Sequence, residues 1–133
     1  MMLTIAILVS LIIISLPLGI NFYRTRQLDT HENGVVQVLR RAQLKSRSID
    51  DDSSFGVYIT TDRYILFKGS SYSDRDPTYD EVSDIPGGFI ISGISEVVFS
   101  KFQGLPSTTG SIILTTDTKS ETIYINEVGN INY

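Results

Sequence analysis

MMLTIAILVSLIIISLPLGINFY, residues 1–23, is the stretch that decides the fold, because it contains no charged side chain. Thirteen Leu, Ile, Val or Phe residues lie between Leu3 and Phe22. As a helix it would extend roughly 33 Å, and the hydrocarbon core of a bilayer is about 30 Å thick. Each of those side chains near the centre of the bilayer favours insertion by roughly 0.3–0.6 kcal/mol. The stretch therefore predicts a transmembrane helix.

Two other interpretations of this stretch remain open. A cleaved secretory signal usually has a shorter apolar run, and no small-residue cleavage site follows this one. A buried core helix would be apolar along one stripe rather than all round. Within the run, Pro17 lacks an N–H and would clash with the carbonyl of Ile13, and Gly19 weakens the same turn. We expect the helix to kink at Pro17 and Gly19. The kink either has a functional role or is incidental.

The composition excludes several classes of function. The chain has 133 residues, so about 110 remain after the apolar stretch, enough for one small domain. Fifteen acidic and eleven basic side chains give a net charge of −4, which argues against a nucleic-acid-binding surface. The chain contains no cysteine, so it has neither disulfides nor thiolate metal ligands. We expect no cofactor and no small-molecule substrate.

Residues 24–49 continue the helix in an amphipathic form. Steps of three and four place one set of residues on a common face: Leu28, Glu32, Val35, Leu39, Ala42, Ser46 and Ile49. Gly34 is an internal weak point worth about 1 kcal/mol relative to Ala. A basic cluster near the end complements the helix dipole. We favour a solvated helix end for this cluster over a phosphate or acidic-lipid site; its members are Arg40, Arg41, Lys45 and Arg47.

The rest of the chain predicts short strands. The first two form a hairpin about Asp62, and residues 116–120 fit the turn of a later hairpin. The expected strands are residues 55–61, 64–68, 88–91, 96–102, 111–116, 122–126 and 130–133. Strands that are neighbours in sequence favour a mostly antiparallel meander, with one face packed on the helix. The predicted class is α+β, with a transmembrane helix half at 1–23, an amphipathic half and linker at 24–54, and a β domain at 55–133.

The acidic segment at residues 70–84 has the most distinctive composition among the expected surface segments. Five carboxylates there could supply oxygen ligands to Ca²⁺, although their spacing does not match an EF-hand loop. We favour a solvated loop; the candidate metal ligands are Asp74, Asp76, Asp80, Glu81 and Asp84. His31, the one histidine, fits an exposed helix residue better than a catalytic base. With neither a nucleophile elbow nor a glycine-rich phosphate loop, we expect no catalytic residue and no enzyme activity.

The order of these features resembles that of a known family. A long N-terminal helix, apolar in its first half and with a proline there, precedes a small antiparallel sheet. The amino-acid sequences of five later segments add to the resemblance: RRAQLKSR (40–47), GVYI (56–59), FSKFQGLP (99–106), IILT (112–115) and IYINEVGNI (123–131). The chain resembles type IV pilins and, among them, the minor pseudopilins of type II secretion, H class.

The resemblance implies a structural subunit. Such a subunit is anchored in the inner membrane by one helix, with its C-terminal domain extracytoplasmic, and then joins a pilus or a periplasmic pseudopilus. Its partners are other pilins or pseudopilins, contacted through the N-terminal helix. The family's basic leader, its mature N-terminal residue and its glutamate at position five do not occur here, so we expect the true start to lie upstream of Met1. The alternative function is a membrane-tethered extracytoplasmic β domain that binds a partner.

Overall fold

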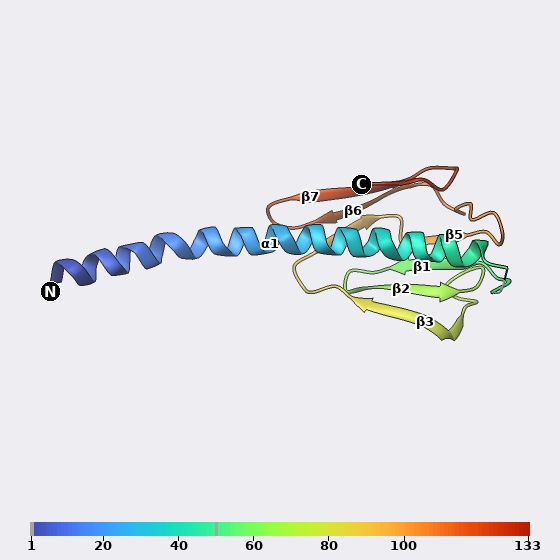
Figure 1. The fold of residues 1–133 in the computed structure, drawn as a ribbon, viewed down its shortest axis with the longest axis horizontal. Coiled ribbons are helices and arrows are strands. Elements are labelled where there is room, and N and C mark those ends of the chain that lie inside the picture. The colour runs from blue at the N-terminus through green and yellow to red at the C-terminus, as the bar shows by residue number, and fades with distance from the viewer. Residues whose placement is uncertain (1, 50) are drawn as a thin grey trace.

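In the part of the chain that the structure describes, one long helix is followed by eight strands (Figure 1). The computed structural model describes residues 2–49 and 51–133, without the side chains of residues 2, 13–22, 24 and 25. The elements are α1 (Met2–Arg47), β1 (Phe55–Ile59), β2 (Arg63–Lys68), β3 (Asp76–Asp84), β4 (Ile90–Gly93), β5 (Glu96–Phe99), β6 (Gly110–Thr115), β7 (Ser120–Ile125) and β8 (Ile131–Asn132). The predicted α+β class is confirmed.

The strands form two antiparallel sheets rather than the single meander that we expected. One sheet has the order β3-β2-β1-β5 and the other has the order β4-β6-β7-β8. Between β4 and β5 the chain passes from the second sheet to the first at Gly93, whose φ of 93° is unfavourable for a residue with a side chain. A Cβ there would also collide with the carbonyl oxygen of Ser111. The turn sends β5 to the free edge of β1, where Phe55 lies opposite Phe99.

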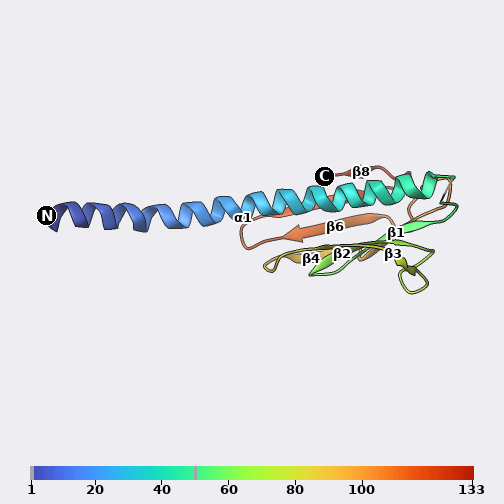
Figure 2. The same ribbon diagram turned by 60° about the horizontal axis from the view of Figure 1, so that its bottom comes forward.

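The second half of α1 lies against both sheets, and its apolar stripe forms the centre of the core (Figures 1 and 2). Leu28, Val35, Leu39 and Ala42 are fully buried, as the helical spacing predicted. Alternate strand residues face them and complete the core: Phe55, Val57, Leu66, Val97, Phe99, Ile112, Leu114, Ile123 and Ile125. Ile49 was wrongly assigned to this face. The helix ends at Arg47, and Ile49 is 80% exposed.

Gly34 is a point of close contact between the helix and the first sheet. A Cβ at this position would lie 2.6 Å from the Tyr64 hydroxyl oxygen of β2. The Tyr64 ring is buried beneath the helix, and the missing side chain makes room for its hydroxyl. The glycine that is a weak point by helix propensity is therefore required by packing.

One loop prediction and two strand predictions need correction. The segment at 70–84 is not a loop throughout, because residues 76–84 form β3, a nine-residue edge strand. Its charged side chains are the kind that protect an exposed edge from pairing with another chain. The strand expected at 96–102 ends at Phe99, since Phe102 adopts a positive φ of 67° in the turn that follows. The strand expected at 88–91 is shifted to Ile90–Gly93.

The helix continues through the positions of Pro17 and Gly19. The side chain of Pro17 lies outside the described part of the chain, so the kink expected there stays a prediction.

Candidate functional site

The first half of α1 extends beyond the sheets as a free rod (Figures 1 and 2). The core begins at Leu28, which is fully buried, whereas residues 3–12 are all exposed. Its large apolar side chains are between 49% and 76% exposed: Leu3, Ile5, Ile7, Leu8, Val9, Leu11 and Ile12. We call residues 2–26 the free half of the helix.

An apolar surface of this kind is rare on a monomeric soluble protein, and large ones mark sites of contact with proteins or membranes. The exposed residues are consecutive, so they cover all sides of the rod rather than one stripe. A single partner on one side would leave the remaining apolar surface in water. The free half is therefore suited to an environment that surrounds it, such as lipid or several neighbouring helices.

Among the described residues, no helix is both long enough and apolar enough to cross a membrane.

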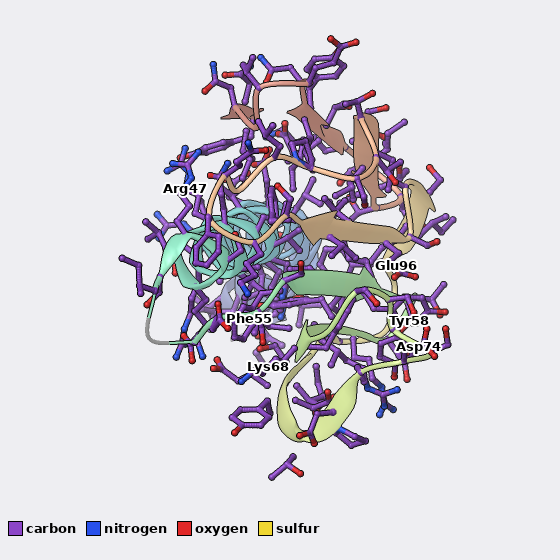
Figure 3. All side chains as sticks on the ribbon, turned by 90° about the vertical axis from the view of Figure 1, so that its right-hand side faces the viewer. Arg47, Phe55, Tyr58, Lys68, Asp74 and Glu96 are labelled. Atoms are coloured by element: carbon purple, nitrogen blue, oxygen red, sulfur yellow. The ribbon has the colours of Figure 1, made fainter. Side chains whose placement is uncertain are left out.

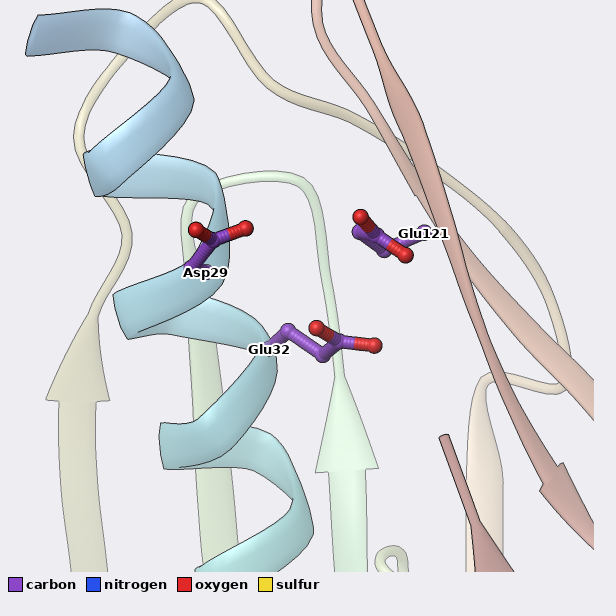
Figure 4. Close-up of side chains that lie close together, drawn as sticks. All are labelled: Asp29, Glu32 and Glu121. Carbon is purple, nitrogen blue, oxygen red and sulfur yellow. The ribbon is translucent and has the colours of Figure 1, made fainter. Parts of the chain in front are cut away.

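Three carboxylates gather where the free half meets the domain (Figure 4). Asp29 and Glu32 are three residues apart on α1, and Glu121 lies on β7 with its side chain on the same face as Ile123 and Ile125. One oxygen from each carboxylate lies within 4.8 Å of the other two. We call these residues the carboxylate cluster.

Burial and mutual repulsion shape the electrostatics of this cluster. Desolvation raises the pKa of the Glu32 carboxyl, and the charges of Glu121 and Asp29 raise it further. Lys119 acts in the opposite direction. Its ammonium group lies 3.3 Å from Asp29 Oδ1 and also contacts Glu121 Oε1. One lysine therefore forms ion pairs with two of the three carboxylates.

His31 is not an exposed helix residue, contrary to our expectation. Its ring packs edge-on against Phe89, with the ring centroids 5.2 Å apart. This partial burial lowers the pKa of His31, so the neutral imidazole is favoured. The position fits a packing residue at the base of the free half.

The five candidate calcium ligands of residues 70–84 do not form one site. Glu81 lies beside α1 and accepts from Arg41 and Lys45, at 2.9 and 3.2 Å. Asp80 instead pairs with Arg75 at 2.8 Å. Of the remaining three, Asp74 accepts from the Ser71 hydroxyl, Asp76 from the Thr78 N–H, and Asp84 lies opposite Arg63 in the strand register.

The part of this segment that precedes β3 folds onto the outer face of the first sheet (Figure 3). The Tyr72 ring stacks on Tyr58 with a centroid separation of 4.0 Å, and Arg75 covers its other side at 3.8 Å. The Tyr72 N–H donates to Glu96 Oε1 at 2.9 Å. The predicted solvated loop is thus held by aromatic and polar contacts, which hydrophilic composition alone did not indicate.

The basic cluster at the end of α1 also has partners within the chain. The side chains of the cluster that we expected to be solvated therefore also make contacts with other parts of the protein. Arg41 and Lys45 contact Glu81, and Lys45 also lies over the Phe55 ring. Arg40 lies over the ring of Tyr133, while Arg47 donates to the Gln103 carbonyl. These contacts tie the helix end to β3, to the C-terminus and to the turn after β5.

The sequence signal for the carboxylate cluster was present in part. Glu32 falls on the helix face that carries Leu28 and Val35, where a charge is unexpected. Glu121 occupies an inward position two residues before Ile123. The sequence did not indicate that these two positions meet, because that depends on the packing of β7 against the helix.

Comparison with protein-family models, curated proteins and solved structures finds no match to this chain.

Proposed function

We propose that the protein is a minor pilin or pseudopilin, a structural subunit of a type IV pilus or a type II secretion pseudopilus. The observation that carries the proposal is the free half of α1, an apolar rod with no covering element at the positions described (Figure 1). In such a filament, apolar helices leave the bilayer and bundle with one another, while the β domains form the outer shell.

The location follows from the same division of the chain. Residues 1–23 carry no charged side chain, whereas residues 24–133 carry fifteen acidic and eleven basic side chains. We propose that the subunit waits in the inner membrane with its β domain on the extracytoplasmic side and then enters a periplasmic or extracellular filament. Its partners are other pilins or pseudopilins, which bury the free half on several sides.

The form of the domain supports a mechanical role. Two of the hollows on the described surface, one between Arg40 and Asn132 and one between Gly93 and Ser111, are wide and open to solvent. The core instead binds the second half of α1 through both sheets. A force on the free half is therefore transmitted directly to the domain through the buried stripe.

The experiment is a matched pair of substitutions on the same helix. Leu11 lies in the free half and is 61% exposed, and Leu44 lies in the second half and is 67% exposed. Cells that express the wild-type chain, Leu11→Asp or Leu44→Asp are sheared, and the sheared filaments and membranes are probed for the protein. We expect Leu11→Asp to be absent from the filament fraction and Leu44→Asp to remain there. A wild-type chain that never enters filaments would overturn the proposal.

The alternative is a membrane-tethered β domain that binds a partner. One observation favours it: residues 70–75 fold onto the outer face of the first sheet and place Tyr72 and Arg75 there. In this case the protein stays in the membrane fraction whatever filaments the cell makes.

A further inference from the structure

Two connections of the β domain lie at the end of the domain that faces the free half of α1 (Figures 1 and 2). They are the β6–β7 turn, residues 116–119, and the β3–β4 loop, residues 85–89. Residues of both connections line one small hollow together with Gln27, the first helix residue after the free half. We call these two connections the collar.

Each part of the collar is held to the helix by a side-chain contact. The Lys119 ammonium group of the turn lies 3.3 Å from Asp29 Oδ1. The Phe89 ring of the loop packs edge-on against His31, with the ring centroids 5.2 Å apart. Asp29 and His31 follow closely after Gln27 in the sequence, so both parts of the collar are held at nearly the same level along the helix axis.

The collar is joined to the free half by continuous helix. Because α1 runs from Met2 to Arg47, the free half and the domain share one helix axis. A helix rises about 1.5 Å per residue, which places Gln27 about 6 Å beyond Tyr23, the last residue of the apolar stretch. The sequence therefore fixes the height of the collar above that stretch.

This height coincides with the headgroup layer of a bilayer. The hydrocarbon core is about 30 Å thick and the whole bilayer about 40–45 Å, so each headgroup layer is about 5–7.5 Å thick. When residues 1–23 fill the core, as the proposed function requires, Gln27 and the collar lie within this layer. Tyr23, which is 65% exposed, then takes the boundary position at which tyrosine is enriched in membrane proteins.

The side chains of the collar suit lipid headgroups rather than acyl chains. In the loop, the large apolar residues Ile85 and Phe89 are buried, and the exposed residues 86–88 are Pro-Gly-Gly. The collar has one acidic and one basic side chain, Asp117 and Lys119, and therefore no net charge. Attraction to anionic lipids needs clustered basic residues, so the collar fits a zwitterionic headgroup.

We propose that the collar rests in the zwitterionic headgroups of the extracytoplasmic leaflet while the subunit waits in the membrane. This inference deepens the proposed function and rests on its membrane-anchored stage. The lipid surface then supports the domain at a fixed height, with the β7–β8 turn held away from the bilayer. The collar contacts have to break before the free half can leave the bilayer for a filament.

The test places single fluorescent labels at different heights, which is simple because the chain contains no cysteine. Gly87→Cys and Thr118→Cys label the collar; both positions are exposed, and a Cβ at Gly87 would meet no atom within 4 Å. Val128→Cys is the matched control, in the exposed β7–β8 turn at the opposite end of β7. The carbonyl of the neighbouring Gly129 accepts from Gln43, about 24 Å further along the helix than the level of the collar.

Each labelled chain is reconstituted in phosphatidylcholine vesicles that contain a lipid with a nitroxide either on its headgroup or deep in its acyl chain. A nitroxide quenches only nearby fluorophores, so the two lipids report two depths. We expect the headgroup nitroxide to quench both collar labels, the acyl-chain nitroxide to leave them bright, and neither to quench the label at Val128. Added phosphatidylglycerol should not change this pattern, because the collar has no net charge.

A fourth label, Leu11→Cys near the middle of the apolar stretch, separates failure of this inference from failure of the proposed function. If the acyl-chain nitroxide quenches the Leu11 label but the headgroup nitroxide leaves both collar labels bright, the anchor stands and the collar contact is overturned. If no lipid quenches the Leu11 label, the membrane-anchored stage is overturned and the collar contact with it. Equal quenching of the collar and Val128 labels would also contradict the collar contact.

Discussion

The two halves of α1 follow opposite rules of side-chain placement. In the free half, residues 3–12 are apolar on nearly every side and all exposed. In the second half, the fully buried apolar residues form one stripe of Leu28, Val35, Leu39 and Ala42, and the exposed side carries Arg40 and Arg41. One continuous helix thus serves two environments. The second half contributes its buried stripe to the core of the domain, while the apolar surface of the free half at residues 3–12 lies outside that core.

The largest effect is expected from a leucine-to-alanine substitution in the second half, compared with the same substitution in the free half. Leu39→Ala removes a fully buried side chain and should lower the free energy of unfolding by about 2–5 kcal/mol. Leu11→Ala changes an exposed side chain, so the change should stay within about 0.5 kcal/mol. Urea unfolding of the full chain in detergent, followed by the tyrosine circular dichroism signal, measures both. Equal losses at the two positions would mean that the free half belongs to the folded core.

Gly34 tests how closely the second half packs. Gly34→Ala should lower the free energy of unfolding by about 1 kcal/mol, because overpacking against Tyr64 outweighs the gain in helix propensity. In a Tyr64→Phe background the nearest ring atom lies 3.6 Å away, an ordinary contact. The alanine should then stabilise the chain by about 0.5–1 kcal/mol. The same sign in both backgrounds would contradict the packing explanation.

At the boundary between the halves, Glu32 should make stability depend on pH. Its folded-state pKa is raised by burial and by Glu121 and Asp29, so the folded chain holds this proton more tightly than the unfolded chain. Relative to Glu32→Gln, the wild-type chain should therefore lose stability as the pH rises above 4.5. Urea unfolding of both chains in a chelator at several pH values measures the difference. A relative gain with rising pH would reverse the assigned sign.

The smallest effect is expected on the exposed side of the second half. Glu81 bridges Arg41 and Lys45, and its side chain is 39% exposed. Glu81→Gln should lower the free energy of unfolding by less than about 1 kcal/mol, and the loss should shrink at high salt. Glu127→Gln is the matched control. A loss that does not change with salt would show that Glu81 acts through packing instead.

Local periodicity was sufficient to predict some of this fold. The steps of three and four from Leu28 to Ser46 identified the buried stripe, and alternation at Ile112 and Leu114 identified β6. The acidic strand β3 escaped prediction, because its exposed edge position leaves little apolar pattern to detect. The pairing of β5 with β1 also escaped prediction, since strand order depends on contacts between distant segments.

The candidate sites divide in the same way. The apolar free half is visible in the sequence, because its composition alone makes it unusual. The carboxylate cluster is not visible, because Glu32 and Glu121 are brought together only when β7 packs on α1. The packed segment around Tyr72 was also not predicted, because its composition is hydrophilic and the contacts of Tyr72 with Tyr58 and Arg75 are tertiary.

The most direct measurement places a photo-reactive benzophenone amino acid at Leu11 or at Leu44 in cells that assemble filaments. Both positions are exposed on the same helix, and they differ only in the half to which they belong. We predict that the probe at Leu11 cross-links to other subunits whose sequences begin with an apolar helix, and that the probe at Leu44 does not. Cross-links from Leu11 to lipid alone, in membranes and in sheared material, would contradict the filament proposal and leave a tethered domain.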